Sequence, residues 1–500
     1  MVQRQIWTWG CPTLETGTLE HDLSVEVCIL GGGIAGLSVG YELARRGHQV
    51  ILLEKHQIGS GELSRTSAHL ASALDDRFEE LIRLHGVDGA RLARESHDSA
   101  ISRIERISQE EGIDCEFERV DGYLFLEPNG DLGQLEREYA AALKAGFSDA
   151  EWQLQLPVEG FDWAPAIRFP RQAQFHPLKY LHGLVRGFMR AGGRLYQDTE
   201  AVKIVPGPPA RVTTNSGAVI SGNILVCATN APIVDWFAMH TKQAAYRTYL
   251  IAMRIAEDAV PSGLYWDTEE PYHYVRRWRD LLLVGGEDHR TGQNEGERLE
   301  RFKRLESWTQ NRFPVAGTVT QWSGQILEPV DGLAFIGRNP GQQHVYIVTG
   351  DSGHGLTHGT LGGLIIPDLV EGKTNPWSSL YDPARRNLKA AASYLKENLT
   401  TVRHLADYVT PGEMAESEIP SGSGAVIRRG LHKIAAYRDA GGVLHQYSAV
   451  CPHMGCVVHW NPVELSWDCP CHGSRFSPHG EVINGPAMKG LEPGIKSTRA

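Results

Sequence analysis

The chain lacks the features that would direct it to a membrane or to nucleic acid. Its longest apolar runs, such as residues 362–370, are far shorter than the about 20 residues that a membrane span needs. The formal net charge is −11, and no block of Lys or Arg is present. We therefore expect no transmembrane segment and no nucleic-acid partner.

The chain also begins without the apolar stretch of a secretory signal, and it contains few cysteines, eight in 500 residues. A cytoplasmic location is the resulting expectation. In that compartment cysteines serve more often as ligands or redox groups than as structural disulfides. Cys28 and Cys227 lie in apolar, strand-like runs, so we interpret them as core residues.

Residues 25–54 have the pattern of a nucleotide-binding βαβ unit. Residues 25–30 (VEVCIL) predict a buried strand, residues 34–46 predict a helix, and residues 49–53 predict a second strand. The unit has the length of about 30 residues that is expected of a dinucleotide-binding motif.

Three glycines and one acid in this unit indicate how a dinucleotide would bind. Gly31 permits a tight turn, Gly33 lets the backbone approach the pyrophosphate, and Gly36 lets the helix pack on the strand. The helix N-terminus offers N–H groups to the phosphates. Glu54, which follows the second strand, can accept hydrogen bonds from the ribose hydroxyls.

Two later segments favour FAD over NAD. Residues 55–75 form a loop rich in Gly, Ser and Thr, where an NAD-binding fold would continue with a helix and a strand. Residues 344–372 predict a second strand, a glycine-rich turn and a helix. The N–H groups of that turn could face the flavin ring or its ribityl chain.

These segments resemble the D-amino-acid oxidase superfamily of flavoproteins, which includes glycine and sarcosine oxidases. The resemblance covers residues 24–395 and rests on GGGIAGLSVGYELARRGHQVILLEK, VCATNA, GQILEPVDGLAFIGR and TGDSGHGLTHG. It implies a Rossmann-like α/β FAD-binding domain interleaved with an α+β antiparallel-sheet substrate domain. The FAD contacts expected on this basis are Gly31, Gly33, Ile34, Ala35, Gly36, Glu54, Lys55, Ser64, Thr66, Val202, Ala228, Thr229, Gly353, His354, Gly355, Leu356 and Thr357.

Two segments predict hairpins of the substrate domain. They are residues 114–127 and residues 272–286, the second turning at 279–280. Alternation places Tyr274 and Arg276 on one face of the second hairpin. An arginine there could clamp a substrate carboxylate through paired hydrogen bonds, and a solvent-facing strand is the alternative.

Three further side chains are candidates for the chemistry at the flavin. His354 lies in SGHGL, which resembles SGHGF of monomeric sarcosine oxidases, and a structural role in the loop is the alternative. Thr357 stands where that family has a lysine for the substrate carboxylate, so a sarcosine-like substrate is not implied. His69 is a candidate for a covalent or noncovalent neighbour of FAD. Arg65 could face the flavin, the substrate or solvent.

Asp351, His354 and His358 also resemble the two-histidine, one-carboxylate iron site of Rieske oxygenases. That site usually separates its histidines by four residues, and here three residues lie between them. The segment also coincides with the flavin-binding turn. A mononuclear iron site is therefore the less favoured interpretation.

The C-terminal stretch CPHMGCVVHWNPVELSWDCPCHGSRF pairs cysteine with histidine twice, as Cys451-x-His453 and Cys469-x-x-His472. Zinc is an alternative, but zinc sites usually pair cysteine with cysteine and histidine with histidine. The pattern resembles a Rieske centre, a [2Fe–2S] cluster in which two histidines replace two cysteines on one iron. The resemblance covers residues 405–500. It implies Cys451 and Cys469 on one iron and His453 and His472 on the other.

Two more cysteines indicate the Rieske subtype. In Rieske proteins of the respiratory type a disulfide joins the two cluster-binding loops, so the resemblance implies a Cys456–Cys471 disulfide. Ser474 matches a hydroxyl that hydrogen-bonds a cluster sulfide in that type, whereas Phe476 stands where it has a tyrosine. With one donor fewer, we expect a reduction potential between the extremes of the Rieske range of about −150 to +300 mV.

The expected organisation is an FAD-dependent oxidoreductase unit (1–404), a polar connector (405–424) and a small all-β Rieske domain (425–500). Within the first unit, the FAD-binding segments are expected at 24–90, 180–235 and 325–395, and the substrate domain at 91–179 and 236–324.

Together the two parts predict a flavin-dependent oxidation of a small amine or amino acid, with hydride passing to FAD and an imine as product. The electrons would then pass singly through the Rieske cluster to an external carrier, such as a cytochrome, a ferredoxin or a quinone-linked carrier. In one alternative the cluster feeds the flavin for a reductive or monooxygenase reaction. In another, O₂ reoxidises the flavin and the Rieske domain is a redox sensor or structural module. A hydroxy acid in place of the amine is a third.

Overall fold

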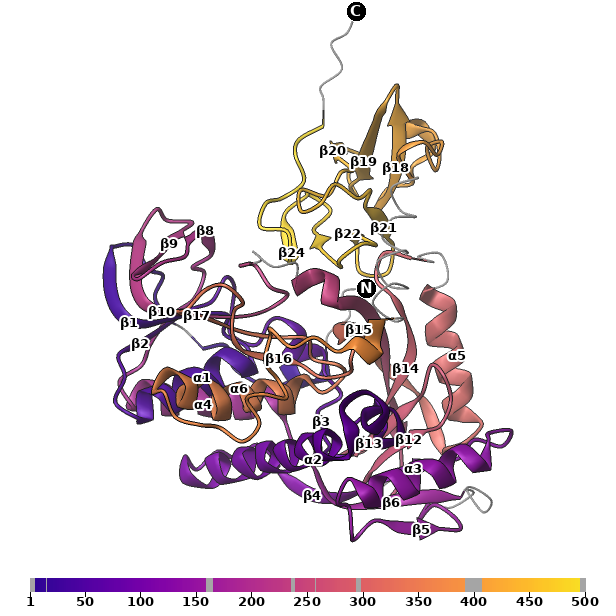
Figure 1. The fold of residues 1–500 in the computed structure, drawn as a ribbon. Helices are drawn as coiled ribbons and strands as arrows, with labels where there is room; N and C mark the ends of the chain where they lie inside the picture. Colours follow the sequence, from indigo (N-terminus) through magenta and orange to yellow (C-terminus); the bar gives the residue numbers. More distant parts are fainter. Residues whose placement is uncertain are drawn as a thin grey trace, which may run out of the picture.

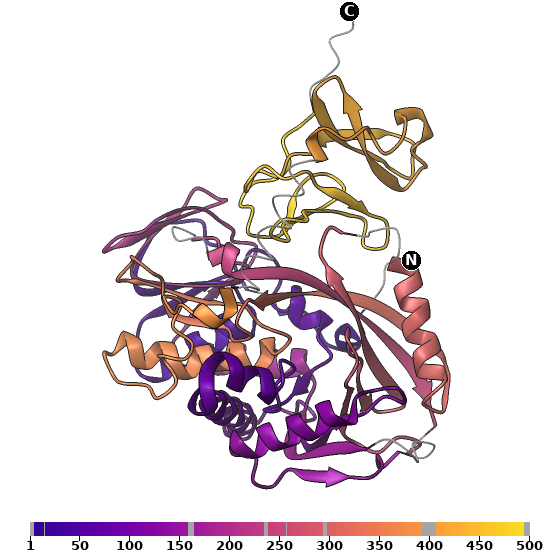
Figure 2. The same ribbon diagram turned by 45° about the vertical axis from the view of Figure 1, so that its right-hand side comes forward.

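The computed structural model describes residues 5–14, 16–158, 165–234, 239–256, 258–293, 298–391 and 407–494. Two sheets lie side by side, and a smaller group of strands, coloured orange to yellow, covers one end of both (Figures 1 and 2). Within the described ranges, no helix is both long enough and apolar enough to cross a bilayer.

The first sheet forms the nucleotide-binding part. Its strands are β1 (Leu23–Leu30), β2 (Val50–Leu53), β7 (Arg194–Tyr196), β8 (Ala201–Val205), β9 (Ala210–Thr214), β10 (Val219–Asn230), β16 (Phe335–Arg338) and β17 (Val345–Thr349). The strand order is β16-β17-β10-β1-β2-β7, and β9 joins β8 to the edge of β10. The central strands β17, β10, β1, β2 and β7 run parallel, which agrees with the predicted Rossmann-like arrangement.

Helices cover this sheet, and the N-terminal turns of α1 and α6 lie close together. The helices of the chain are α1 (Ile34–Arg45), α2 (Phe78–Glu110), α3 (Leu132–Lys144), α4 (Pro177–Arg190), α5 (Arg298–Gln310) and α6 (Gly355–Val370). Glycines let α6 pack closely on α1, because a Cβ on Gly359 would lie 2.6 Å from Ile34 and one on Gly363 would lie 2.8 Å from Ser38. Short 3₁₀ helices are η1 (Ile6–Thr8), η2 (Glu62–Arg65), η3 (Met239–Lys242), η5 (Leu388–Ala390) and η7 (Glu416–Glu418).

The second sheet is mostly antiparallel and forms the predicted substrate domain. Its strands are β3 (His69–Leu70), β4 (Glu118–Phe125), β5 (Glu151–Gln153), β6 (Ala166–Gln174), β11 (Gln243–Ile255), β12 (Leu264–Asp267), β13 (Tyr274–Trp278), β14 (Leu281–Arg290) and β15 (Val315–Pro329). The order is β15-β11-β14-β13-β12-β4-β6-β3, with β5 on β6. Only β12 and β4 pair in parallel among these described strands.

The two predicted hairpins have different outcomes. β13 and β14 pair antiparallel and turn at 279–280, so that prediction is confirmed. The prediction for residues 114–127 is wrong, because β4 is one continuous strand that pairs with β6 and β12.

The C-terminal domain is all-β, as expected. Three strands form one sheet, β18 (Ser423–Arg429), β19 (His432–Arg438) and β20 (Leu444–Ser448). Four form the other, β21 (His459–Asn461), β22 (Ser466–Asp468), β23 (Arg475–Phe476) and β24 (Val482–Asn484). The first strand begins inside the predicted connector. Residues 405–406 of that connector and 495–500 of the predicted domain lie outside the described residues.

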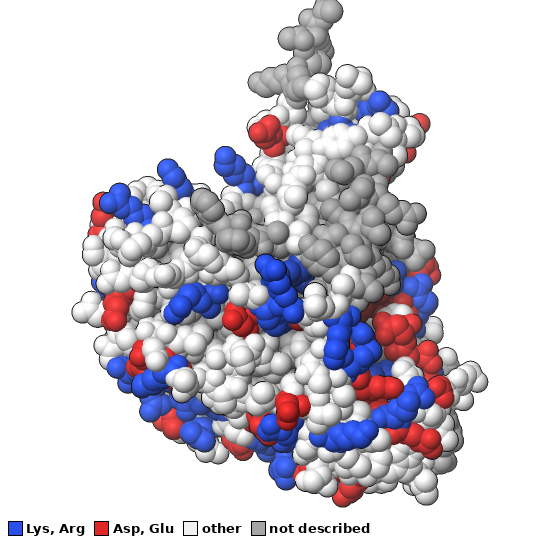
Figure 3. All heavy atoms as spheres, viewed as in Figure 1, with Lys and Arg blue, Asp and Glu red and all other residues white. Residues whose placement is uncertain are grey.

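Charged side chains of both signs are interspersed on the face shown in Figure 3. No single-sign block covers that face, which agrees with the absence of a basic run in the sequence.

Candidate functional site

A cavity of about 440 Å³ lies where the two sheets and the C-terminal domain meet. Its walls come from the β1–α1 turn, the loop after β2, the N-terminus of α6 and one face of the antiparallel sheet. Side chains between Val482 and Met488 of the C-terminal domain complete the wall. The cavity is therefore shared by all three parts of the chain.

Gly31, Gly33 and Gly36 meet different surroundings in and after the β1–α1 turn. A Cβ on Gly31 would lie 2.3 Å from the carbonyl oxygen of Ala228, and one on Gly36 would lie 2.0 Å from the carbonyl oxygen of Gly31. A Cβ on Gly33 would instead meet nothing within 4 Å, and Gly33 lines the cavity. This open space at the N-terminus of α1 fits a pyrophosphate group.

Glu54 and Lys55 lie at the adjoining edge of the cavity. The Glu54 carboxylate accepts hydrogen bonds from the backbone N–H groups of Gly32 (2.6 Å) and His56 (2.9 Å). Lys55 pairs with Glu200 at 2.8 Å and donates to a backbone carbonyl of the C-terminal domain. The two backbone donors orient the carboxylate, as recognition of a ribose would require.

Most of the expected FAD contacts line this cavity. Those that do are Gly31, Gly33, Ile34, Ala35, Glu54, Lys55, Thr66, Ala228, Thr229, Gly353, His354, Gly355 and Leu356. Gly36 serves helix packing instead, and Val202 is 45% exposed. Ser64 and Thr357 donate their hydroxyls to nearby backbone carbonyls.

His354 precedes the first residue of α6 and belongs to a hydrogen-bonded chain along the wall. Its Nε2 accepts from the backbone N–H of Asp75 (2.9 Å) and lies 3.5 Å from the Asp75 carboxylate. The hydroxyl of Tyr272 donates to the other oxygen of that carboxylate (2.6 Å). Burial disfavours a charged imidazole, but Asp75 outweighs burial and raises the pKa of His354.

His69 lines the cavity as a neutral side chain. Its Nδ1 lies 2.9 Å from the hydroxyl of Ser67, and its Nε2 lies 3.3 Å from the carbonyl oxygen of Val275. Burial, assisted by the charge of Arg276, lowers the pKa of His69 to about 3. A neutral imidazole is therefore expected beside the cofactor at neutral pH.

Arg65 lines the cavity but turns its guanidinium toward the C-terminal domain. One nitrogen donates to the carbonyl oxygen of Ser323 (3.0 Å) and lies 3.5 Å from the carboxylate of Glu464. Its charge is thus already paired at the domain interface.

Tyr274 and Arg276 have separate surroundings. Tyr274 lines the cavity, and its hydroxyl lies 2.7 Å from that of Thr248. Arg276 is 1% exposed, does not line the cavity, and donates to the carbonyl oxygens of Ala68 (2.7 Å) and Phe175 (3.2 Å). The predicted carboxylate clamp is therefore not formed at Arg276, because backbone acceptors already bind its guanidinium.

The residues compared with an iron site do not converge on one point. Asp351 accepts from the backbone N–H of Leu327 (2.6 Å), and His358 places Nε2 3.2 Å from Nε2 of His97. Within the described ranges, the one group of potential metal ligands that lie close together consists of cysteines in the C-terminal domain.

Several cavity residues were not singled out from the sequence. They are Asp75, Thr248, Trp266 and Asp288. Asp288 had a signal in retrospect, because it is an acid that follows the apolar start (LLLVGG) of β14. Thr248 and Trp266 gave none, since a single polar or aromatic residue in a strand is ordinary.

The C-terminal domain contains two loops with the same hydrogen-bond pattern, Cys451 to Cys456 and Cys469 to Ser474. In each loop the N–H of the first cysteine donates to the carbonyl five residues later, at 2.8 Å in both. The carbonyl of that cysteine accepts from the N–H four residues later, at 3.0 and 3.1 Å. The two loops therefore hold their first cysteines in equivalent positions.

The four predicted cluster ligands come together at the ends of these loops. Cys451 and Cys469 are buried, and their thiols lie close enough to interact. The rings of His453 and His472 are perpendicular, with centroids 5.0 Å apart. Two sulfur and two nitrogen donors on adjacent loops fit a Rieske cluster.

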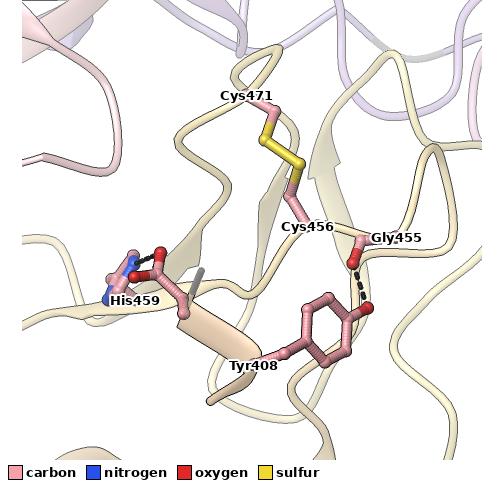
Figure 4. The surroundings of a disulfide bond; sticks show 6 residues. Tyr408, Gly455, Cys456, His459 and Cys471 are labelled. Atoms are coloured by element: carbon pink, nitrogen blue, oxygen red, sulfur yellow. Dashed lines mark hydrogen bonds and ion pairs between the residues drawn. A yellow bond between two sulfur atoms is a disulfide. The ribbon is translucent and has the colours of Figure 1, made fainter. Parts of the chain in front are cut away.

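A disulfide joins the two loops, between Cys456 and Cys471, with Cα atoms 6.4 Å apart (Figure 4). The same figure shows Tyr408, whose hydroxyl donates to the carbonyl oxygen of Gly455. Ser474 accepts from the backbone N–H of a neighbouring segment at 3.0 Å and also contacts the thiol of Cys451. The loops are thus tied together on both sides of the predicted cluster position.

The histidine ends of both loops face residue 240 of the N-terminal oxidoreductase unit (1–404), which includes both larger sheets and is called the flavin-binding part from here on. The ring of His240, on η3, lies edge-on to His453 and to His472, with centroid distances of 4.7 Å in both cases. A Cβ on Gly292 would lie 2.6 Å from the backbone nitrogen of Pro470. This fit leaves no space for a side chain at position 292, where the second loop meets the flavin-binding part.

A charged cluster next to this contact joins the two domains. The Glu464 carboxylate receives hydrogen bonds from Arg247 and Ser323 of the flavin-binding part and from Arg475 of its own domain. The Arg247 side chain is fully buried, and that of Glu464 is 9% exposed. Burial opposes ionisation of Glu464, but the arginines outweigh burial and lower its pKa.

Family models match both parts of the chain. One described as FAD dependent oxidoreductase (DAO) matches residues 26–369, and one described as Rieske [2Fe-2S] domain matches residues 412–496. The chain belongs to the DAO family of FAD-dependent oxidoreductases. It carries a Rieske domain in addition, so its cofactors are FAD and a Rieske [2Fe–2S] cluster.

Similar proteins match either nearly all of this chain or somewhat less than three quarters of it. YhfW of Bacillus subtilis (strain 168), named for a Rieske 2Fe-2S iron–sulfur protein, is 32% identical over 95% of this chain and 94% of its own length. Gamma-glutamylputrescine oxidoreductase of Escherichia coli (strain K12) is 26% identical over 71% of this chain and 85% of its own. The structure of glycine oxidase from Geobacillus kaustophilus has a TM-score of 0.61 at 20% identity, over 73% of this chain and 99% of that one.

Proposed function

We propose that this protein oxidises a small amine or amino acid and delivers the electrons singly, through its Rieske domain, to an external one-electron carrier. FAD would supply the two-electron acceptor and the cluster a one-electron carrier. The relation to gamma-glutamylputrescine oxidoreductase and the glycine oxidase fold support an amine or amino acid as substrate. The cytoplasmic location remains a prediction from the sequence.

The observation that carries this proposal is the contact between the cavity and the Rieske domain. Residues between Val482 and Met488 line the cavity itself. His240 of the flavin-binding part lies against both His453 and His472. An arrangement in which the predicted cluster ligands face the flavin-binding part favours electron transfer within one chain.

The side chains of the cavity have roles that follow from their surroundings. Gly33 and the N-terminus of α1 would bind the pyrophosphate, and Glu54 would bind the ribose. Tyr274 lies on the wall where the substrate would be oriented, and His354, held by Asp75, lies opposite it at the start of α6. We propose Cys451, Cys469, His453 and His472 as the ligands of the cluster.

The test is anaerobic reduction of the purified protein by a panel of amines and amino acids. Flavin bleaching is followed by absorbance, and the cluster by low-temperature electron paramagnetic resonance. We expect a substrate to bleach the flavin first and a Rieske signal to appear afterwards. A flavin that bleaches while the cluster stays oxidised would contradict the relay and favour the oxidase with a sensor domain.

Two variants separate the steps. His453→Ala removes one proposed cluster ligand, so flavin bleaching should persist while the Rieske signal disappears. His432→Ala changes an exposed histidine of the same domain and should preserve both signals. If the cluster must be reduced before the flavin in the native protein, the direction of electron flow is the reverse of the one proposed.

A further inference from the structure

The antiparallel sheet presents a small set of polar side chains to the cavity. Thr248 comes from β11, Tyr274 from β13 and Asp288 from β14, and Tyr272 precedes β13. Trp266 of β12 adds an apolar surface beside them. In the proposed function this wall faces the substrate, because the opposite walls carry the nucleotide-binding turn and the start of α6.

Asp288 is the acid of this wall that has no cationic partner. Its Oδ1 atom is buried and accepts no hydrogen bond from any described residue. Its carboxyl group interacts with the hydroxyl of Thr248, and burial raises the pKa of Asp288 to about 7. Burial disfavours the charged form of a carboxylate because it loses contact with water. A cation bound beside it compensates for this loss and stabilises the charged form.

Among the residues that the structure describes, the cavity has no unpaired Lys or Arg that could bind a substrate carboxylate. Among the described residues its only Lys and Arg are Lys55 and Arg65. Lys55 pairs with Glu200 at 2.8 Å, and Arg65 binds the carbonyl oxygen of Ser323 at 3.0 Å and faces Glu464. An α-amino acid would therefore bring a carboxylate into a cavity with an unpartnered acid and no free arginine or lysine.

Asp288 also borders a second, outer pocket of about 540 Å³. Arginines of that pocket already pair with its acids, Arg304 with Glu287 at 2.7 Å and Arg312 with Glu127. Asp288 thus lines both pockets and lies on the wall between them.

We propose that Asp288 binds the ammonium group of the substrate, and that the substrates are cationic amines without a carboxylate beside the amine. This inference rests on the proposed function and narrows it from amines and amino acids to amines. Asp288 is then a specificity-determining residue, with the hydroxyls of Thr248 and Tyr274 beside it.

The test uses three probes of one shape that cannot be oxidised, because their central carbon carries no hydrogen. They are tert-butylamine (a cation), 2-aminoisobutyrate (a zwitterion) and pivalate (an anion). Each is titrated anaerobically into the oxidised holoenzyme, and the shift of the flavin absorption band gives its Kd. We expect tert-butylamine to bind about tenfold or more tightly than either carboxylate probe.

Three variants test the residue. Asp288→Asn keeps the shape of the side chain and removes its charge, so it should raise the Kd of tert-butylamine about tenfold or more. Asp288→Glu should retain part of the affinity. Asp280→Asn, in the exposed turn of the same hairpin and paired there with Arg254, should change nothing.

The inference is overturned if either carboxylate probe binds the native protein as tightly as tert-butylamine, or if tert-butylamine fails to bind at about 100 mM. It is also overturned if Asp288→Asn binds tert-butylamine within about twofold of the native protein. Failure of the proposed function is a separate result, in which neither oxidisable amines nor amino acids bleach the flavin. If amino acids bleach the flavin and Asp288→Asn has no effect, only the narrower inference fails.

Discussion

At the scale of single residues, Glu464 joins the Rieske domain to the flavin-binding part. Its carboxylate binds Arg247 across the interface and Arg475 within its own domain. Both arginine side chains are almost completely buried. Removing one partner of a buried ion pair is costly, because the remaining charges lose their compensation.

We predict that Glu464→Gln loosens the domain interface. The loss of a buried charge costs about 3–5 kcal/mol, so the urea concentration at which flavin fluorescence appears should fall by on the order of 1 M. Glu492→Gln, an exposed acid of the same domain, is the control and should leave the midpoint unchanged. Equal midpoints for the two variants would show that Glu464 does not stabilise the interface.

The same residue predicts a pH dependence. The arginines hold the pKa of Glu464 far below its usual value of about 4.3. A lowered pKa contributes stability that is present above the unfolded value and is lost as the pH falls through the folded value. The urea midpoint of the native protein should therefore fall below about pH 4. The Glu464→Gln variant should show a shallower fall, and parallel curves would contradict this.

Residue-scale predictions succeeded where the reason for a residue is local. Gly31 and Gly36 are required by neighbours within the βαβ unit or the adjoining strand, and their spacing in the sequence already indicates this. Arg276 and Arg65 had no such signal, because their partners lie on distant segments. Asp288 follows the apolar start of β14, but that position alone did not reveal a cavity that is formed by strands far apart in the chain.

At the scale of elements, β11 connects the cavity with the Rieske domain. Its Thr248 lines the cavity, and its neighbour Arg247 binds Glu464. Ala245, earlier on the strand, lies against the second cluster-binding loop, where a Cβ on Gly473 would be 2.2 Å from it. Alternation along one strand therefore directs the cavity residue Thr248 and the interface residues Ala245 and Arg247 to opposite faces.

Gly292 provides a test of this contact. An alanine Cβ there would lie 2.6 Å from the backbone of Pro470, so Gly292→Ala should push the second loop away from the flavin-binding part. We expect slower reduction of the cluster after the flavin is reduced. The rate is measured by rapid anaerobic mixing, freeze-quenching and electron paramagnetic resonance of the cluster.

Gly217→Ala is the matched control for backbone strain. Gly217 has φ +88° and Gly292 has φ +77°, but nothing lies within 4 Å of a Cβ on Gly217. Both variants should lose about 1–2 kcal/mol of stability, since each forces an L-residue into the left-handed region. Equal rates of cluster reduction in the two variants would exclude a role for the loop contact.

The incorrect prediction of a hairpin at residues 114–127 shows why strands and turns are harder to predict than motifs. The Asp121-Gly122 pair in residues 114–127 is typical of a turn. In β4 the glycine has another purpose, because a Cβ on Gly122 would lie 2.8 Å from the ring of Trp266. The glycine makes room for a ring from β12, a partner that the local sequence does not reveal. In the second hairpin, β13 and β14 turn at 279–280 as expected, and that prediction was confirmed.

At the scale of the whole molecule, the Rieske domain lies at one end of the two larger sheets (Figures 1 and 2). It contributes part of the wall of the cavity. Its predicted histidine ligands face His240, and its segment from Val482 to Met488 lines the cavity. An external carrier would therefore receive electrons from a domain whose position is fixed by buried contacts.

This arrangement predicts that electron transfer from flavin to cluster is intramolecular and insensitive to salt. The pairs of Glu464 with Arg247 and Arg475 are buried, and buried pairs are screened far less than exposed ones. The rate of cluster reduction should stay constant when the protein is diluted and when salt rises from about 0.05 to 0.5 M. Transfer to an oppositely charged external carrier should by contrast slow with salt, because salt screens the attraction between exposed charges. If the internal step slowed on dilution, the cluster of one chain would accept electrons from the flavin of another. If it slowed with salt alone, exposed charges would hold the two domains together.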